Sequence, residues 1–337
     1  MAIDCSIFCT AAAFIVSLIT TSTILKKWID VARERGLVGK DINKEGDIFV
    51  PESGGVGFVM GTVMGAFAAI ALSVFLFNFD DWLIYALASI TTFLMAAFIG
   101  FVDDVLGWKR GLSHKAKVMS TLPIAVPLAA VNAGVKVMCL PIVGCINFGI
   151  LYPTVIVPIG VVGATNAFNM IAGLNGLEAG MGSIIYATLG VLSLHHERFA
   201  SAVLSFAALG ASIGFLYWNK YPAKVFPGDV FTYAAGALIA AIAIIGNMEG
   251  AALILFIPYF VELLLYLYGK MNNVEKESWG IPKDGCLEIP YDKPYSVTHL
   301  AMLLLKKVTG CAKEWAVVAL ILVVEAIIAV TTLLIYW

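Results

Sequence analysis

Residues 83–104, LIYALASITTFLMAAFIGFVDD, place a run of uncharged, mostly apolar side chains directly before two aspartates. A helix needs about 20 apolar residues to cross the hydrocarbon core of a bilayer, so the run predicts a transmembrane helix over 82–101. A carboxylate is costly inside a membrane unless it faces water, a cation or a protein partner. Asp103 and Asp104 therefore mark the end of a span and a candidate site at the membrane boundary.

Similar apolar runs recur along the whole chain. Of its 337 residues, 61% are hydrophobic and 13% are charged, whereas a soluble domain carries about 25% charged residues. A single soluble core cannot hold this much apolar surface, so lipid must cover much of it. The chain is predicted to be an all-α, polytopic membrane protein that forms one domain over residues 1–337. Ten transmembrane helices are expected, over 6–25, 54–78, 82–101, 118–134, 149–165, 177–194, 200–218, 230–246, 251–269 and 315–336.

Ten spans place alternate loops on opposite sides of the membrane, and the basic residues distinguish the two sides. The loops on one side hold 19 of the 21 lysines and arginines. Short basic loops stay in the cytoplasm, so this side is predicted to be cytoplasmic and both termini to be non-cytoplasmic. In the last of these loops, residues 296–308 fit an amphipathic helix at the membrane interface. The predicted cytoplasmic loops are 26–52, 102–117, 166–176, 219–229 and 270–314.

The polar motifs of the chain lie at these cytoplasmic loops. Asp103 and Asp104 are followed within fourteen residues by a basic cluster that includes Lys115 and Lys117. Carboxylates suit a hard divalent cation and basic side chains suit phosphate oxygens. The pair and the cluster together favour a site for Mg²⁺ and phosphate, and a solvated helix end is the alternative.

Three further motifs lie at other cytoplasmic loops. Asn166 and Asn169, in NAFNMIAGLNGLEAG (166–180), share a helical face, and their amides can coordinate a cation or read a nucleobase; a polar helix cap is the alternative. FPGD (226–229) places Asp229 directly before a span, as a third acidic ligand or as an N-cap. PESGG (51–55) opens another span, where free helix N–H groups can receive an anion.

The six cysteines show no metal-ligand spacing. We interpret them as small buried hydrophobic residues. A disulfide between Cys139 and Cys145 is the alternative, and it requires their loop to face an oxidising compartment. These two cysteines flank a Pro/Gly segment within residues 135–148, which fit a small hairpin.

The four motifs PESGG, FVDDVLG, NAFNMIAGLNGLEAG and FPGD occur in this order, each at a predicted cytoplasmic loop. They resemble those of the polyprenyl-phosphate N-acetylhexosamine-1-phosphate transferase family, and the likeness covers nearly the whole chain. Residues 172–180 are more similar to the UDP-GlcNAc–dolichyl-phosphate GlcNAc-1-phosphotransferase branch than to the bacterial phospho-muramoyl-pentapeptide branch. The absence of the lumenal insertions of eukaryotic members makes the chain similar to an archaeal member.

The resemblance implies an Mg²⁺-dependent enzyme, with Mn²⁺ as an alternative metal, that acts at the cytoplasmic face of the cell membrane. The enzyme would transfer HexNAc-1-phosphate, in this branch GlcNAc-1-phosphate, from a UDP-sugar to a polyprenyl or dolichyl phosphate and release UMP. Nucleic acid is not an expected partner, and the sequence leaves open whether the protein forms a homodimer.

The resemblance also implies roles for individual residues. Asp229 and Asn169 would bind the metal ion. Asp103, Asp104 and Lys115 would be catalytic, with Lys115 at the acceptor phosphate. The implied substrate-binding residues are Glu52, Asn166, Asn175 and Lys117, with Asn175 at the uracil.

The last cytoplasmic loop departs from the family pattern. Residues 270–298 contain no arginine or histidine, whereas this loop of the family carries a His/Arg-rich motif that grips the pyrophosphate and the sugar. The sugar therefore stays open, and a pseudomurein-type muropeptide precursor is an alternative donor. A transporter is a further alternative, although transporters carry their polar residues at mid-bilayer. Direct attack by the acceptor phosphate is favoured over an aspartyl-phosphate intermediate, because a phosphomonoester is already ionised at neutral pH.

Overall fold

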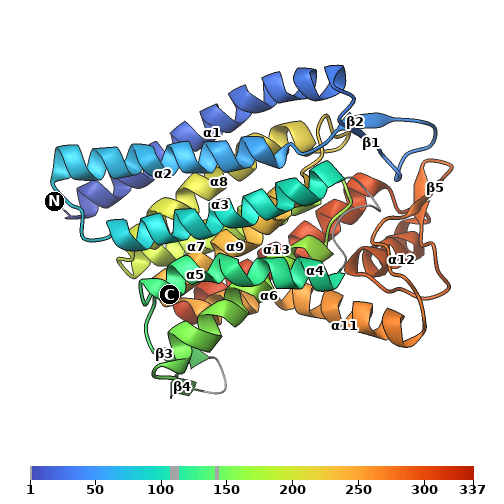
Figure 1. The fold of residues 1–337 in the computed structure, drawn as a ribbon. Helices are drawn as coiled ribbons and strands as arrows, with labels where there is room; N and C mark the ends of the chain where they lie inside the picture. Colours follow the sequence, from blue (N-terminus) through green and yellow to red (C-terminus); the bar gives the residue numbers. More distant parts are fainter. Residues whose placement is uncertain (1, 107–113, 141–143) are drawn as a thin grey trace.

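The computed structural model describes residues 2–106, 114–140 and 144–337, with side chains from Cys5 onward except at 114–116. Within these residues the protein is a polytopic bundle of helices (Figure 1). Eight helical segments of the described chain are long and apolar enough to cross a membrane. They are α1 (Ala2–Glu34), α2 (Gly55–Phe77), α3 (Leu83–Leu106), η2 with α6 (Tyr152–Ile156 and Val157–Met170), α7 (Leu177–His195), α8 (Phe199–Asn219), α9 (Gly228–Gly246) and α13 (Glu314–Tyr336).

Two segments that the sequence predicts as spans are interrupted. Residues 118–134 contain an apolar helical stretch, Lys117–Ala130, that is shorter than a span. It lies within α4 (His114–Thr121), η1 (Leu122–Ala125) and α5 (Val126–Ala130). Residues 251–269 fold as α10 (Glu249–Leu255) and α11 (Ile257–Met271), which meet at a bend of 57°.

Prolines lie at both interruptions. Pro123 and Pro127 stand in the first turns of η1 and α5, and Pro258 stands in the first turn of α11. Proline has no backbone N–H and its ring collides with the preceding turn, so a helix breaks or bends there. The ten expected spans therefore correspond to eight continuous helical segments, one bent pair and one shorter apolar stretch in the described chain.

Helix α9 lies at the centre of the bundle, and nearly all of its residues are buried. It packs against α3 and α6, while α1 packs against α2 and α8. Gly61 of α2 lies directly against α1, where a Cβ would stand 1.9 Å from the hydroxyl of Thr21. Small residues therefore allow these two helices to approach closely.

Three antiparallel hairpins join helices of the described chain. The hairpin expected within 135–148 is confirmed as β3 (Val137–Leu140) and β4 (Gly144–Asn147). The sequence did not predict the other two, which are each only three residues per strand. They are β1 (Val38–Lys40) with β2 (Phe49–Pro51), and β5 (Ile281–Lys283) with β6 (Cys286–Glu288).

The interpretation of all six cysteines as small buried residues is wrong for four of them. Cys139 stands opposite Cys145 in the β3–β4 register, and the two form a disulfide. A second disulfide joins Cys286 of β6 to Cys311, which follows α12 (Val297–Thr309). Cys5 and Cys9 are free and buried, as expected. Antiparallel pairing and a chain reversal bring the bonded cysteines together, and neither can be read from their spacing.

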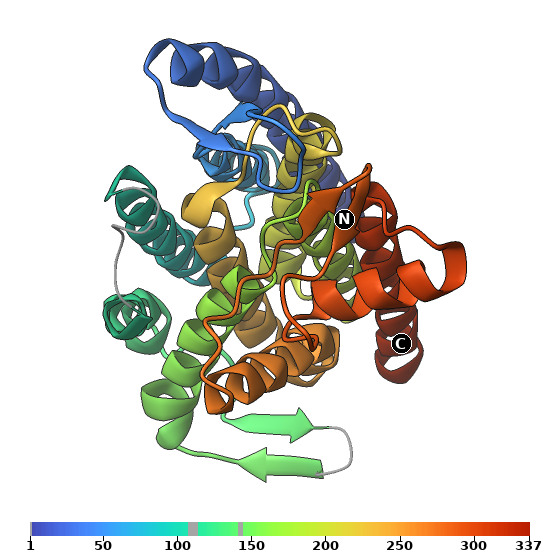
Figure 2. The same ribbon diagram turned by 90° about the vertical axis from the view of Figure 1, so that its right-hand side faces the viewer.

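The bundle has two distinct ends. Both chain termini lie toward one end, and β1, β2, β5 and α12 lie at the other (Figure 1). Viewed onto that second end, the β1–β2 and β5–β6 hairpins and α12 lie around the ends of the central helices (Figure 2). Helix α12 confirms the helix predicted over 296–308, and the hydroxyl of Ser296 caps it by accepting a hydrogen bond from the N–H of Thr298. All five predicted cytoplasmic loops meet at this end, as the contacts described next establish.

Candidate active site

A lysine and two aspartates from three different helices form the centre of the site. The Lys117 ammonium of α4 lies 2.5 Å from Asp103 Oδ2 of α3 and 2.7 Å from Asp229 Oδ2 of α9. Close packing of α3 against α9 brings the two carboxylates together. It is possible because Gly100 has no side chain, since a Cβ there would stand 2.2 Å from the Asp229 carbonyl oxygen. The site therefore concentrates opposite charges in a part of the bundle that is largely removed from water.

Asp104 has a different position from its neighbour. Its Oδ1 accepts a hydrogen bond of 2.7 Å from the N–H of Asp229, and its Oδ2 accepts one of 3.3 Å from the N–H of Val230. These donors belong to the first turn of α9, where backbone N–H groups lack helical partners. Gly228 has φ +68° and a Cβ there would collide with Asp104 Oδ2. Asp104 therefore caps α9 and fixes the position of Asp229, so we assign it a positioning role.

We expect Asp104→Ala to lower the stability of the folded protein by about 1–2 kcal/mol, the usual cost of losing a helix N-cap. Asp104→Asn keeps one acceptor oxygen and should retain most of that stability. Thermal unfolding in detergent, together with the turnover rate of both variants, measures this. A stable Asp104→Asn protein with no activity would contradict a purely positioning role and indicate that the carboxylate itself takes part in the chemistry.

The hydroxyl group of one threonine contacts both of the predicted metal ligands. The hydroxyl of Thr232 donates to Asn169 Oδ1 at 2.9 Å and lies 3.3 Å from the carbonyl oxygen of Asp229. Asn169, Thr232 and the Asp229 side chain all line a cavity of about 220 Å³. Sequence reasoning missed Thr232, although it lies one helical turn after Asp229 and faces the same side of α9.

The donor set of this cavity fits a hard divalent cation. Asp229 and Asn169 line the cavity, and Asp103 adds a second carboxylate, which shares Lys117 with Asp229. Mg²⁺ prefers oxygen ligands and is held in proteins by one or two carboxylates together with substrate phosphates. In the described ranges no three His, Cys, Asp or Glu residues are arranged so that they could hold a metal ion by themselves, so a metal here would rely on substrate oxygens to complete its coordination.

Asn175 also lines this cavity and connects four loops. Its backbone N–H donates to Glu314 at the start of α13, and its Nδ2 donates to Asp41 at 3.3 Å. Its Oδ1 accepts a hydrogen bond of 2.7 Å from the N–H of Ala223. Lys44 pairs with both Glu314 and Asp41. Sequence reasoning placed Asn175 at the uracil, and the structure adds that its amide organises the cavity wall.

PESGG and FPGD meet directly, which corrects the interpretation of PESGG. The N–H groups of Gly54 and Gly55 donate to the carbonyl oxygens of Phe226 and Pro227, both at 2.9 Å. The first N–H groups of α2 are thus used within the protein and are not available to an anion. Glu52 lies beside them, and burial raises the pKa of its carboxyl group. The side chain of Lys115, predicted to hold the acceptor phosphate, lies outside the described part of the chain.

Asn166 lies away from the cavity, although it is only three residues from Asn169. Its Nδ2 donates to Thr121 Oγ1 at 3.1 Å and to the carbonyl oxygen of Val162 at 2.8 Å. Asn166 lines a second, strongly apolar groove of about 590 Å³ between α6, α9, α10 and α11. Residues of this groove include Gly160, Gly163, Ala167, Met170, Ile239 and Phe256. The last turn of α6 therefore separates a polar cavity from an apolar groove.

The last loop packs against the same turn of α6. Lys276 Nζ and Ser278 Oγ both lie within hydrogen-bond distance of the Met170 carbonyl oxygen, at 3.2 and 3.3 Å. Lys276 also pairs with the buried carboxylate of Glu262. His299 Nδ1 accepts from the N–H of Tyr295, and Nε2 lies 3.2 Å from the Trp279 carbonyl oxygen. Burial lowers the pKa of His299 to about 4, so the ring is neutral at pH 7 and holds the loop.

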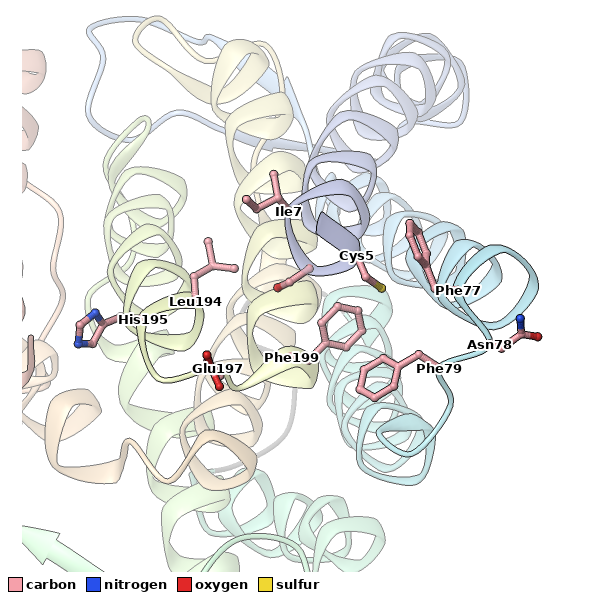
Figure 3. Close-up of a pocket in the computed structure, with 10 residues that line it drawn as sticks. Cys5, Ile7, Phe77, Asn78, Phe79, Leu194, His195, Glu197 and Phe199 are labelled. Atoms are coloured by element: carbon pink, nitrogen blue, oxygen red, sulfur yellow. The ribbon is translucent and has the colours of Figure 1, made fainter. Parts of the chain in front are cut away.

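The opposite end of the bundle also contains a large pocket (Figure 3). It is lined by apolar and aromatic side chains such as Phe77, Phe79 and Phe199, with Glu197 and His195 at its edge. Its described lining includes no lysine or arginine and a single acidic residue. Phosphate chemistry needs concentrated charge, so the end that holds Lys117 suits such chemistry better than this pocket does.

Known proteins resemble this chain in sequence. A family model described as glycosyl transferase family 4 matches residues 85–247, which include Asp103, Lys117, Asn169 and Asp229. A Saccharolobus solfataricus protein named "Putative UDP-N-acetylglucosamine--dolichyl-phosphate N-acetylglucosaminephosphotransferase" is 36% identical over 94% of this chain and 92% of its own length. A Sulfolobus acidocaldarius protein of the same name is 34% identical over the same shares.

A more distant relative bears a different name. A phospho-N-acetylmuramoyl-pentapeptide-transferase of Halalkalibacterium halodurans is 38% identical, but over only 49% of this chain and 53% of its own length. The two archaeal proteins match over most of their length, well beyond the region of the family model. The chain belongs to glycosyl transferase family 4.

Proposed function

We propose that this protein transfers GlcNAc-1-phosphate from UDP-GlcNAc to a dolichyl or polyprenyl phosphate. The products would be a lipid-linked pyrophosphate sugar and UMP. The observation that carries the proposal is the Asp103–Lys117–Asp229 cluster, in which Asp229 lines the polar cavity and Lys117 directly precedes Val118 of the apolar groove. The names of the two archaeal relatives support the choice of both substrates.

The polar cavity suits the nucleotide-sugar donor. Asn169, Thr232 and Asp229 line it together with residues of the Asn175 loop. Mg²⁺, held by Asp229 and Asn169, would neutralise the charge of the donor pyrophosphate. Amide and backbone groups of the Asn175 loop supply both donors and acceptors of hydrogen bonds, as recognition of a base and a sugar requires.

The apolar groove suits the lipid acceptor. Its walls are almost entirely apolar, so an isoprenoid chain can lie in it without desolvating polar groups. Asn166 lies in the groove, and Lys117 is held by the neighbouring α4. An acceptor phosphate at this end of the groove would thus lie near the carboxylate–lysine cluster.

The reaction would form one bond and break one. An oxygen of the acceptor phosphate attacks the β-phosphorus of the donor, and the bond from that phosphorus to the bridging oxygen breaks and releases UMP. Phosphoryl-type transfer depends on alignment and charge stabilisation rather than on covalent chemistry by the protein. Lys117 would offset the repulsion between the two anionic substrates. Asp103 and Asp229 would hold Lys117 in place, and Asp104 would fix the start of α9.

The orientation and number of crossings form part of the proposal. The site would face the cytoplasm of the cell membrane, both termini would lie on the other side, and the bent α10–α11 pair and the α4–α5 segment would complete ten crossings. The support is the charge asymmetry, since loops at the site end carry 19 of the 21 basic residues. Reaction of single introduced cysteines at 47 and 80 with an impermeant reagent in intact cells would test it, with labelling expected only at 80.

We expect Gly163→Phe to raise the KM for the lipid acceptor by about tenfold or more, because a phenyl group in the groove displaces contacts of the isoprenoid chain. No atom lies within 4 Å of a Cβ built at Gly163, so the protein should fold normally. Ala71→Phe, on an exposed position of α2 outside the groove, is the matched control. An unchanged acceptor KM in Gly163→Phe would place the lipid elsewhere.

The proposal is tested by release of UMP from purified protein given UDP-GlcNAc, a polyprenyl phosphate and Mg²⁺. UMP formation that depends on all three is expected. A parallel incubation with a UDP-linked muropeptide tests the alternative donor. Release of UMP from the muropeptide and not from UDP-GlcNAc would overturn the choice of donor.

A further inference from the structure

Asn43 lies in the short connection between β1 and β2, outside the four motifs of the site, and it lines the polar cavity. Its side chain is nearly fully buried, with 5% of its surface exposed. Nδ2 donates a hydrogen bond of 2.6 Å to the carbonyl oxygen of Gly173, and Oδ1 accepts one of 3.0 Å from the N–H of Gly280. One amide thus joins the first, third and fifth predicted cytoplasmic loops, at the end of the bundle that holds Lys117.

The Gly173 end of this bridge belongs to the wall of the polar cavity. Gly173 lies between Asn169 and Asn175 in sequence, lines the cavity with them, and has φ +119°. Its N–H donates to Glu178 Oε1 at 2.8 Å, while its carbonyl oxygen accepts from Asn43. The peptide groups on both sides of a residue with an unusual backbone conformation are therefore held, and Asn43 supplies one of the two restraints.

The Gly280 end belongs to the loop that departs from the family pattern. This loop is attached at Lys276 and Ser278 to the end of α6, next to Asn169. Its far side is attached by the Cys286–Cys311 disulfide and by the Leu287 N–H to the Ala312 carbonyl oxygen, at 2.8 Å. Gly280 lies between these attachments, and its bond to Asn43 fastens this part of the loop to the cavity wall. The N–H of Gly285 adds a second contact with the same connection, since it donates a hydrogen bond of 3.1 Å to Glu45.

We propose that Asn43 is a positioning residue for the donor: it seats the last loop against the polar cavity and thereby sets the affinity for the nucleotide-sugar. The proposal rests on the proposed function. An amide is suited to this role because it can donate to a carbonyl and accept from an N–H at the same time. The loop that lacks the His/Arg motif is thus placed by a residue outside it.

The test compares Asn43→Ala and Asn43→Asp with Asn272→Ala. Asn272 is the matched control because it is an exposed asparagine at the end of α11, whose amide donates to the Tyr268 carbonyl oxygen away from the cavity. We expect Asn43→Ala to raise the KM for UDP-GlcNAc by about tenfold or more, since two buried partners lose their hydrogen bonds. The KM for the lipid acceptor should stay within about twofold, because the groove is lined by other residues.

Asn43→Asp should raise the donor KM further than Asn43→Ala does. Its carboxylate can still accept from Gly280, but it faces the Gly173 carbonyl oxygen and adds negative charge beside a cavity for an anionic donor. Cleavage by a lysine-specific protease at Lys283, in the exposed β5 strand, reports on the position of the last loop. This measurement does not depend on the transferase activity of the protein. The rate at Lys283 should rise several-fold in both variants relative to cleavage at Lys270 on α11.

Donor and acceptor KM values that rise equally would overturn the proposal, as would unchanged protease sensitivity at Lys283. A general loss of folding would appear as a lowered melting temperature and faster cleavage at both lysines, which would also count against a specific positioning role. Failure of the proposed function is a separate result, because the wild-type protein would then release no UMP. The protease comparison would still show whether Asn43 holds the last loop in place.

Discussion

Replacement of Lys117 by methionine is expected to lower kcat/KM by about 100- to 1000-fold, the range seen when a charge-stabilising group is removed from an active site. Methionine has nearly the same length as lysine but carries no charge. Lys117 is the cation that lies within 2.7 Å of both Asp103 and Asp229. Its removal leaves two carboxylates facing each other and leaves the acceptor phosphate without a counter-charge.

Two further variants separate charge from packing. Lys117→Arg keeps the charge, but its planar fork differs in shape from a compact ammonium, so partial activity is expected. Lys224→Met is the control, because Lys224 is an exposed lysine at the same end that stacks on Trp218. Turnover and thermal unfolding are measured for all three. A Lys117→Met protein that keeps more than about a tenth of wild-type activity would contradict the role assigned to the cluster.

Asp229→Asn is expected to lower kcat by about 1000-fold and to raise the Mg²⁺ concentration needed for half-maximal activity. The substitution keeps the size of the side chain, and it keeps the backbone N–H that donates a hydrogen bond to Asp104. It removes the negative charge that a divalent cation and Lys117 both need. The effect on stability should be smaller than the effect on rate, because the lost pair with Lys117 is partly compensated by the remaining pair with Asp103.

The control for this variant is Asp47→Asn. Asp47 is an exposed aspartate at the same end that pairs with Lys40 at 2.7 Å, and exposed pairs contribute little to stability. A titration of activity with Mg²⁺ for wild type, Asp229→Asn and Asp47→Asn distinguishes metal binding from general damage. If Asp229→Asn lost activity with an unchanged Mg²⁺ requirement, Asp229 would act through Lys117 alone and would not be a metal ligand.

The positions of the helices were predictable because hydropathy alone determines them. Leu83–Leu106, Leu177–His195 and Glu314–Tyr336 begin and end within a few residues of the predicted spans, apart from a five-residue extension of the first that carries Asp103 and Asp104. The length of α1 was underestimated, because residues 26–34, five of which are charged, continue the helix beyond its apolar part. Short hairpins such as β5–β6 have too few residues for a periodic pattern.

The sequence predicts which residues belong to the candidate site better than it predicts how they are arranged. Acidic and amide groups at loop boundaries identified Asp103, Asp229 and Asn169, since such groups are costly near lipid without a function. The same argument could not separate Asp104, which caps α9, from Asp103, which contacts Lys117. Asn166 and Asn169 shared a predicted helical face, yet hydrogen bonds to Thr121 and Val162 hold the first on the groove side.

Contacts between distant loops could not be predicted at all. Asn43 lies 130 residues from Gly173 and 237 residues from Gly280, and a lone asparagine in a polar loop carries no signal of either partner. The role of Asn175 as a link between four loops depends equally on the packing of α7, α8 and α13. Such cross-links arise from tertiary structure, and only the folded chain reveals them.

The central claim, transfer of sugar phosphate rather than sugar, is tested most directly with UDP-GlcNAc labelled with ³²P at its β-phosphorus. Purified protein is incubated with this donor, a polyprenyl phosphate and Mg²⁺, and the lipid is extracted into organic solvent. The account predicts that the label enters the lipid fraction and that unlabelled UMP accumulates in the water phase. Label that stays in the water phase as UDP, while GlcNAc enters the lipid, would contradict it.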